Sequence, residues 1–514
     1  MQKLLRTVGL TIFISSILVG CSKKEATDAN VEADSKSLTI IAGSEIEMIN
    51  PLIAEASTKL GFPIVVKYTG TIDGVETVKS GANYDVAWFG NAKYFYDTPE
   101  NSKRIKLSEK IMFSPVIVGV RAESFNKHGL KESENYTWKD IASWVKDKNM
   151  TYAMTDPSVS NSGYVALMGV IYATTNKGEN IAVADVNKEV VQNFFKGQKV
   201  TAKSSNWLMD TFNKETNIDF IVNYESTILN NSTKLIPVYP NEGIITSDYP
   251  MLLLNDKKTE QYKAFVQYMK GKDVQTKLVN NYKYRSGNAE VMLAQKVIDA
   301  DKLLIEMPFN PDADLSENIL MAYFNEYKKP AKFAFVVDTS GSMSGDREIE
   351  MKKMIDSFVK GNISKFATIR NREEIEVVPF STQVGQTKTF TANQKTEFNS
   401  YIQNLHMDGG TAMYDGVATA IHKLVEDKKI NGDKYRYSVI VLTDGMSNEG
   451  ANMEGFSEWF IKNKVESQGI RIFAISFGDA DINQLNSVTS ISGGKVFDGK
   501  KNLSSAFREI RSYQ

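Results

Sequence analysis

Hydrophobic residues along the chain occur in two alternating patterns: short continuous runs, and stretches in which they recur every three or four positions. The runs at 38–43, 63–68 and 84–90 have the length and composition of buried strands. Between the first two runs, residues 50–60 have the spacing of an amphipathic helix. Strands that alternate with helices predict a parallel α/β sheet, and this pattern extends over residues 38–307.

Two further apolar runs suggest that this first domain is divided. They lie at 115–120 and 249–254, where they could bracket a second lobe inserted at about 122–244. We therefore expect a domain of two lobes.

A linker is expected at 308–330. Proline residues interrupt the periodicity at its beginning, and apolar residues then recur on one face of 316–328. This spacing predicts a helix that Ser316 caps and that Pro330 ends.

Residues 331–514 repeat the alternation of strands and helices and predict a Rossmann-like doubly wound sheet. The expected strands lie at 333–337, 374–379, 437–442 and 470–477, and the expected helices at 347–360, 396–405, 413–427, 455–468 and 503–513.

The N-terminus has the features of a secretory signal. A basic start precedes an apolar stretch at 8–19 that is too short to span a bilayer as a helix. The stretch ends in Leu18-Val19-Gly20-Cys21, which resembles the bacterial lipobox. The resemblance implies removal of residues 1–20, lipidation of Cys21 and attachment to a bacterial membrane on the extracytoplasmic side, at the cell surface or in the periplasm. A failed transmembrane helix, or an ordinary signal peptide with a chance cysteine, is the alternative.

A flexible tether is expected after the lipidated residue. Residues 22–37 are polar and have no aromatic side chain, so they cannot bury a core. Some sixteen such residues reach roughly 20 Å on average. Residues 21–37 would therefore hold the folded domains close to the membrane.

The chain has 61 basic and 62 acidic residues in 514, a balance that does not favour nucleic acid as a partner. Its three histidines have no zinc-ligand spacing, which argues against a zinc enzyme. Cys21 is the only cysteine, so no disulfide forms within the chain and both domains depend on core packing.

Three short motifs in the second domain carry oxygen-bearing side chains. Asp338, Ser340 and Ser342 form a D-x-S-x-S motif directly after the first predicted strand, Thr411 follows two glycines before a helix, and Asp444 follows a later strand. Open parallel sheets bind ligands at the carboxyl ends of strands, near the point where the strand order reverses. Carboxylates and hydroxyls are hard oxygen ligands that suit Mg²⁺.

These five residues resemble the metal ion-dependent adhesion site of von Willebrand factor type A domains, and the resemblance covers residues 331–514. It implies a Mg²⁺ site, with Mn²⁺ or Ca²⁺ as alternatives, whose free position accepts a carboxylate from a protein or peptide partner. A structural cluster of turns without metal is the competing interpretation.

The first domain resembles the class II extracellular solute-binding proteins of bacterial transport systems. The matching motifs are Ala42-Gly43-Ser44, residues 84–91 and 155–163, and Asn223-Tyr224-Glu225. The resemblance implies a small solute held between two lobes, in contact with residues at strand ends and helix N-termini: Ser44, Thr71, Asn91, Ser160, Asn161, Ser162 and Glu225. Turn and N-cap roles for the serines are the alternative, with Ser162 as a helix cap. Glu225 and Glu45 would repel an oxyanion if they faced this pocket.

These observations predict a surface-anchored binding protein that engages a protein or peptide partner through its metal site. A solute-binding component of a transport system with an accessory second domain is the alternative. No nucleophile elbow, suitably placed histidine base or second metal cluster is evident in the sequence, so an enzyme is not expected.

Overall fold

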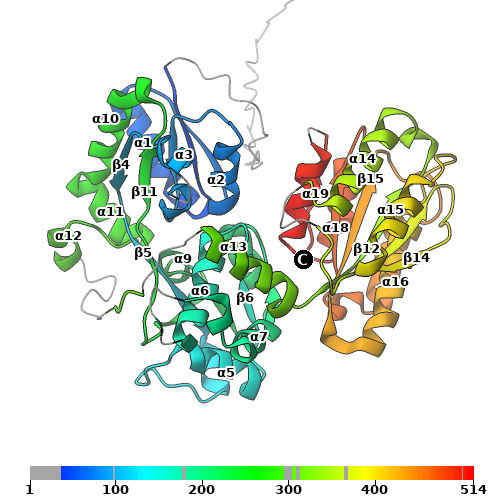
Figure 1. Ribbon diagram of the computed structural model, residues 1–514, viewed down its shortest axis with the longest axis horizontal. Coiled ribbons are helices and arrows are strands. Elements are labelled where there is room, and N and C mark those ends of the chain that lie inside the picture. The colour runs from blue at the N-terminus through cyan, green and yellow to red at the C-terminus, as the bar shows by residue number, and fades with distance from the viewer. Residues whose placement is uncertain are drawn as a thin grey trace, which may run out of the picture.

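The computed structural model describes residues 36–96, 99–175, 177, 181–294, 304–307, 313–363, 368–500 and 502–514. The expected signal peptide at 1–20, the lipidation site Cys21 and most of the tether lie outside the described residues. Figure 1 shows two α/β lobes built from the first half of the chain and a third α/β body built from the C-terminal part.

The first lobe contains a five-stranded sheet in the order β2-β1-β3-β11-β4. Its first three strands are parallel, but β11 runs antiparallel to both β3 and β4. The expectation of a parallel sheet is thus wrong at β11, because this strand follows the inserted lobe and re-enters the sheet from its opposite end. The strands are β1 (Leu38–Gly43), β2 (Ile64–Thr69), β3 (Val86–Trp88), β4 (Leu107–Lys110) and β11 (Pro250–Leu253), and the helices are α1 (Asn50–Leu60), α2 (Thr71–Lys79), α3 (Pro99–Ser102), α10 (Thr259–Lys270), α11 (Lys272–Tyr282) and α12 (Ala289–Ala294).

The second lobe has a six-stranded sheet in the order β10-β5-β8-β6-β7, with β9 paired to β5. Strand β5 is antiparallel to β8, β9 and β10, so the expectation of a parallel sheet is wrong in this lobe too. The chain enters this lobe between β4 and β5 and leaves it between β10 and β11, so two crossings join the lobes. The strands are β5 (Ser114–Arg121), β6 (Tyr152–Met154), β7 (Gln198–Val200), β8 (Phe220–Tyr224), β9 (Leu235–Val238) and β10 (Thr246–Ser247), and the helices are α4 (Ala122–Lys127), α5 (Trp138–Lys148), α6 (Asn161–Thr175), α7 (Lys188–Lys196), α8 (Ser205–Lys214) and α9 (Glu225–Leu229).

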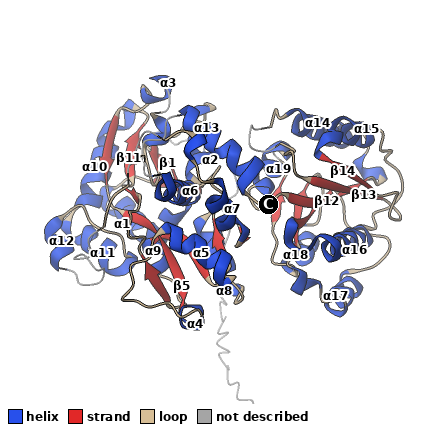
Figure 2. Cartoon of the chain, turned by 60° about the horizontal axis from the view of Figure 1, so that its bottom comes forward, coloured by secondary structure: helices blue, strands red, loops and turns tan. Residues whose placement is uncertain are grey.

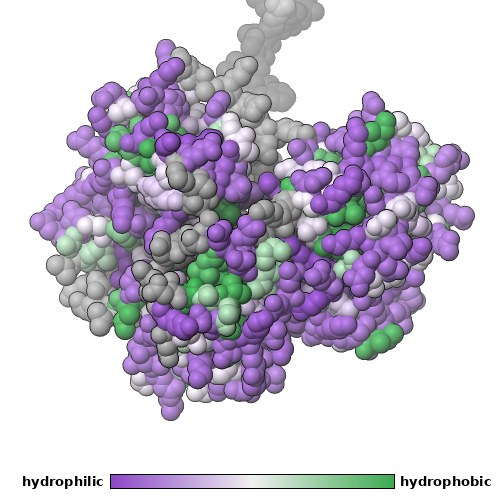
Figure 3. All heavy atoms as spheres, viewed as in Figure 1, coloured by the Kyte–Doolittle hydropathy of each residue, from purple (hydrophilic) through white to green (hydrophobic). Residues whose placement is uncertain are grey.

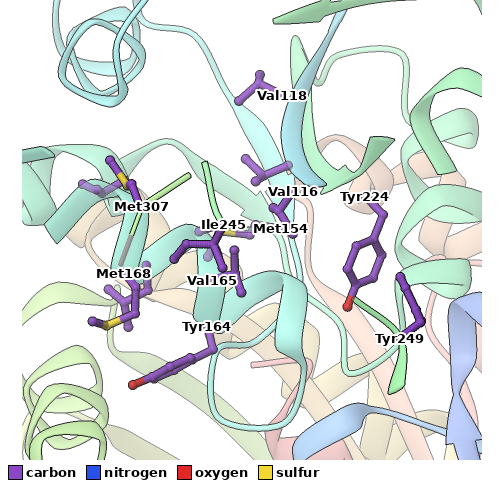
Figure 4. Close-up of a cluster of buried hydrophobic side chains, with 14 of the residues drawn as sticks. Val116, Val118, Met154, Tyr164, Val165, Met168, Tyr224, Ile245, Tyr249 and Met307 are labelled. Carbon is purple, nitrogen blue, oxygen red and sulfur yellow. The ribbon is translucent and has the colours of Figure 1, made fainter. Parts of the chain in front are cut away.

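Helix α6 forms the centre of the second lobe. Its residues are buried from Asn161 to Tyr172, all round the helix, as expected of a helix enclosed by other elements. Figure 4 shows Val165 and Met168 of α6 beside Val116 of β5 and Met154 of β6, in one hydrophobic cluster. This packing fixes the first turn of α6 at the boundary between the lobes.

The linker helix begins earlier than the sequence predicts. Helix α13 (Ala313–Ala322) continues into one π-helical turn, Tyr323–Tyr327. The expected Ser316 cap is therefore wrong: Ser316 lies inside the helix, where its hydroxyl oxygen accepts a 2.8 Å hydrogen bond from Tyr164. The helical segment ends before Lys328, whose ammonium pairs with the buried Asp156 of the second lobe at 3.3 Å.

The C-terminal part forms a six-stranded sheet in the order β14-β13-β12-β15-β16-β17, in which only β14 is antiparallel. Numbered from its own first strand, the order is 3-2-1-4-5-6, which confirms the doubly wound prediction. The strands are β12 (Ala331–Asp338), β13 (Glu374–Phe380), β14 (Lys388–Thr391), β15 (Arg436–Thr443), β16 (Arg471–Ser476) and β17 (Val496–Asp498).

Helices cover both faces of this sheet (Figure 2). Helices α14 and α15 lie on one side, and α16 and α17 on the other. The helices are α14 (Asp346–Lys360), α15 (Lys395–Gln403), α16 (Met413–Asn431), α17 (Met453–Lys462), α18 (Ile482–Ser490) and α19 (Leu503–Arg511). The sequence did not predict β14, β17 and α18, which are short or lie at the edge of the sheet.

Helix α19 contacts both lobes of the first domain. Its Arg508 pairs with Asp73 of the first lobe at 3.0 Å, and its Glu509 pairs with Lys203 of the second lobe at 2.9 Å. The C-terminal domain thus lies against the first domain at the boundary between its lobes.

The surface in Figure 3 is mostly hydrophilic, with hydrophobic residues in small separate groups. Among the described residues, we find no helix with the length and apolar character needed to span a bilayer.

Candidate metal site and interlobe cleft

The five predicted metal-site residues lie together at the carboxyl end of the C-terminal sheet. Asp338 is the last residue of β12, and Asp444 directly follows the neighbouring strand β15. Ser340 and Ser342 lie in the turn after β12. The Oγ atoms of Ser340 and Ser342 are 3.0 Å apart, and Ser342 donates a 2.8 Å hydrogen bond to Asp444 Oδ1.

These separations fit one octahedral cation. Oxygen ligands held ~2.0–2.1 Å from Mg²⁺ lie about 2.9 Å from their nearest neighbours in the shell. The 3.0 and 2.8 Å contacts of Ser342 have this length. No three His, Cys, Asp or Glu side chains within the described ranges are grouped as a metal site. Hydroxyl groups must therefore complete any ligand set here.

Thr411 is held beside the serines by the loop after β15. Its amide donates a 2.8 Å hydrogen bond to Asn448 Oδ1, and its carbonyl accepts one from Ser447 Oγ at 3.0 Å. A Cβ built on Gly445 would lie 3.7 Å from Ser342 Oγ and 3.9 Å from Thr411 Oγ1. The hydroxyls of Ser342 and Thr411 therefore both lie near Gly445, although they belong to different loops.

Asp338 is fully buried. Its carboxylate accepts hydrogen bonds from the Ser340 amide at 2.8 Å and from the Thr443 hydroxyl at 2.5 Å. Burial raises the pKa of Asp338, and the nearby charge of Asp444 acts in the same direction. A divalent cation would offset both effects, because it stabilises the ionised carboxylate.

Arg347 belongs to this site, although the sequence analysis did not identify it. Its guanidinium pairs with Asp444 through one nitrogen and with Asp479 through the other, the second contact at 2.7 Å. Arg347 lies in the first turn of α14, where the helix dipole disfavours a cation. A basic residue in this unfavourable position is the one feature of the sequence that could have indicated an acidic partner nearby.

The seven predicted solute-contacting residues are all buried at the boundary between the lobes. On the first-lobe side, the carbonyl of Ser44 accepts a 2.8 Å hydrogen bond from Asn206 of the second lobe. Thr71 opens α2, whose next two amides donate to the Val159 carbonyl of the second lobe. Asn91 accepts from the Lys93 amide at 2.8 Å, a local turn contact.

The predicted contact residues of the second lobe already make hydrogen bonds to other groups of the protein. Asn161 bonds the hydroxyls of Tyr94, Tyr224 and Ser247 at 2.8, 3.1 and 2.8 Å. The Ser162 hydroxyl lies 2.8 Å from that of Thr155, 3.2 Å from that of Ser160 and 3.3 Å from that of Ser205. Helix α6 begins at Asn161, so Ser162 lies in the first turn and is not the N-cap proposed as the alternative.

The two glutamates at this boundary differ in their partners. Glu225 receives two hydrogen bonds from Arg285, at 2.7 and 2.8 Å, and one from Tyr239. Glu45 has no salt bridge among the described residues, and its buried Oε1 has no hydrogen-bond partner. Burial raises the pKa of Glu45 to about 7. The sequence alone identified Glu45 only as a possible repulsive charge.

The aromatic residues around Glu45 complete the cleft. Tyr224 and Tyr249 lie side by side (Figure 4), with their ring centroids 5.8 Å apart, and Tyr249 makes an edge contact with Tyr284 at 5.4 Å. Tyr284 donates a hydrogen bond to the Glu45 carbonyl at 3.2 Å. Side chains of the protein thus fill the space between the lobes around the predicted contacts.

Comparison with known proteins identifies both halves of the chain. Residues 38–281 match the family model of a bacterial extracellular solute-binding protein, and residues 333–510 match that of the von Willebrand factor type A domain. The solute-binding match indicates an extracytoplasmic protein. No curated protein matches the sequence.

Several solved binding proteins resemble the first half. The periplasmic binding protein AfuA from Actinobacillus pleuropneumoniae is 16% identical, with a TM-score of 0.44 over 57% of this chain and 99% of its own. The sulfate-binding protein SubI from Mycobacterium tuberculosis is 16% identical, with a TM-score of 0.41 over 50% and 90%. The ferric binding protein from Campylobacter jejuni is 14% identical, with a TM-score of 0.42 over 55% and 96%.

Proposed function

We propose that this chain, which joins a bacterial extracellular solute-binding domain to a von Willebrand factor type A domain, captures an acidic protein or peptide partner through a divalent cation. The observation that carries the proposal is the contact of the Ser342 hydroxyl with both Ser340 and Asp444, at 3.0 and 2.8 Å, beside Asp338 at the ends of β12 and β15. Mg²⁺ is the proposed ion, and the proposed activity is binding and not catalysis.

The charge of the site supports an acidic partner. Asp338 and Asp444 at most neutralise a divalent cation, and Arg347 already pairs with Asp444. A carboxylate from a partner would complete the ion's shell and also meet the guanidinium. Ser342 and Met446 at the rim are exposed, so this side of the site is open to a partner.

A lipid anchor on Cys21 would place this activity at a membrane surface. The lipobox-like sequence Leu18-Val19-Gly20-Cys21 supports the proposal. One acyl chain holds a protein only marginally, whereas two or more hold it stably. The polar tether that follows would keep the partner-binding site close to the bilayer.

Solute delivery to a membrane permease is the second candidate, and the family match of residues 38–281 favours it. The cleft between the lobes would then accept a small solute after the lobes separate. Binding of a small solute by the full chain, lost on substitution of Asn161, would favour this function. Solute binding should not depend on a divalent cation, whereas partner binding at the metal site should, and this difference distinguishes the two candidate functions.

Calorimetric titration of the full chain with Mg²⁺ and Mn²⁺ tests the first proposal. Asp338→Ala should abolish binding of the ion, whereas Asp346→Ala should leave it unchanged, because Asp346 begins α14 as an exposed residue outside the ligand set. A library of acidic peptides should then be retained only with metal present. Failure of the wild-type chain to bind either ion, or equal binding by Asp338→Ala, would refute the metal site.

A further inference from the structure

A cavity of about 670 Å³ lies at the junction of the two domains. Its walls come from the second lobe of the first domain, from the linker and from the C-terminal domain. The volume lies in the range of pockets that hold small molecules. We refer to it as the junction cavity; neither the metal site nor the interlobe cleft contributes to it.

Positive charge is in excess around the junction cavity. Six basic and four acidic residues line it. Four of the basic residues influence one another electrostatically, and Asp433 is the acidic residue that opposes them: they are Lys199, Lys329, Lys428 and Arg436. Asp433 pairs with Lys428 at 3.5 Å, and its side chain is 62% exposed, so solvent screens much of its charge.

Two of these cations make no direct ion pair among the described residues. Lys199 and Lys329 make no salt bridge within the described part of the chain. Burial lowers the pKa of Lys329 to about 8; the charge of Asp433 opposes this effect, and the positive charges of Arg436, Lys199 and Lys428 add to it. An anion in the cavity would relieve this repulsion and compensate the burial.

Arg471 supplies a further unused donor. One of its guanidinium nitrogens pairs with Glu215, while the buried Nη1 has no hydrogen-bond partner. The guanidinium also lies over the Trp207 ring, 5.5 Å from its centroid. Both residues line the cavity, which therefore offers a fixed donor and a flat aromatic wall beside the lysines.

We propose that the junction cavity binds a small phosphoryl anion with at least two negative charges. Arginine and lysine together are the usual protein donors to phosphoryl oxygens, with the guanidinium providing directed hydrogen bonds and the ammonium groups providing charge. Because the walls belong to both domains, such a ligand would strengthen their contact. Binding of a soluble anion in the cavity would thus be coupled to the relative position of the solute-binding and metal-binding domains.

Titration calorimetry of the full chain with inorganic pyrophosphate tests this proposal. The titration is done at constant ionic strength and without divalent cations, so that the metal site does not contribute. We expect one ion per chain, and at least tenfold weaker binding by both Lys199→Gln and Lys329→Gln. Neither substitution leaves an unpaired carboxylate, so both variants should keep the wild-type circular dichroism spectrum.

Two further substitutions test whether the anion binds at a defined site or is attracted only by the overall charge of the domain. Lys462→Gln removes an exposed lysine of the C-terminal domain that does not line the cavity, and it should leave affinity unchanged. Asp433→Asn removes the opposing carboxylate and should tighten binding about threefold. The proposal is overturned if pyrophosphate does not bind, if Lys462→Gln weakens binding as much as Lys329→Gln does, or if the two cavity lysines can be replaced without effect.

Discussion

Glu45 should make the protein less stable as the pH rises from about 4.5 to about 7. Its folded-state pKa of about 7 lies above the ordinary value of 4.5, because burial penalises the charged form. Between these values the folded state holds a proton that the unfolded state has released, so stability falls with rising pH. The difference of about 2.5 pKa units corresponds to about 3 kcal/mol at 1.36 kcal/mol per unit.

Glu45→Gln isolates this effect, since the amide keeps the shape of the side chain and does not titrate. We expect the variant to gain about 3 kcal/mol over the wild type as the pH is raised from 4.5 to 8. Urea unfolding of the full chain, followed by tryptophan fluorescence, measures both proteins at each pH. Trp88 reports on the same region, because its Nε1 donates a 3.1 Å hydrogen bond to the Tyr249 carbonyl.

Glu55→Gln provides a control of opposite sign. Hydrogen bonds from Lys277 and Lys59 lower the pKa of Glu55 to about 2. Its stabilising contribution is present above pH 4.5 and lost as the pH falls toward 2, so this variant should lose stability relative to the wild type as the pH rises. A stability difference between Glu45→Gln and the wild type that stays constant with pH, or that changes in the direction expected of Glu55→Gln, would refute the reasoning.

Three further substitutions test the junction, the metal site and the core. Lys328→Met should cost about 3–5 kcal/mol in urea unfolding, because it leaves a buried carboxylate unpaired, and adding Asp156→Asn should recover most of the loss. Arg347→Ala should tighten Mg²⁺ binding about fivefold in calorimetry, on the order of 1 kcal/mol, since it removes a competing cation; unchanged or weaker binding would contradict this. Gly169→Ala should lower the melting temperature by a loss of about 1–3 kcal/mol, because its Cβ would lie 2.8 Å from the Trp138 ring; an unchanged or higher melting temperature would show that the ring can move.

The positions of Asp338 and Asp444 at neighbouring strand ends were predictable because their signal is local, whereas the metal itself stays a prediction. Asp338 and Asp444 each follow a continuous apolar run, and the order of a doubly wound sheet brings the ends of those runs together. Arg347 was missed because only the tertiary fold shows that Asp444 and Asp479 lie opposite its helix turn. Residue patterns do not reveal a contact between a helix and loops that follow it by about a hundred residues.

The interlobe cleft was harder to predict for the same reason. Motifs placed the serines and Asn161 at the correct helix end, but their partners are hydroxyls from other elements, among them Tyr94, Tyr224 and Ser205. Strands β14 and β17 were missed because short edge strands are half exposed and carry little periodic signal. The antiparallel direction of β11 depends on the path of the chain between lobes, which residue patterns do not encode.

Strand β12 has a mechanical consequence. It begins at Ala331, beside the junction with the first domain, and ends at Asp338 in the metal site. Under the proposed function, a force on a partner bound at the metal site would therefore act along this strand, against the proposed membrane anchor of the chain. Its hydrogen bonds to β13 and β15, on both sides, would be loaded in shear and would have to break together instead of one after another. The central strand β12 would then carry this force through the domain without separating from its neighbours one hydrogen bond at a time.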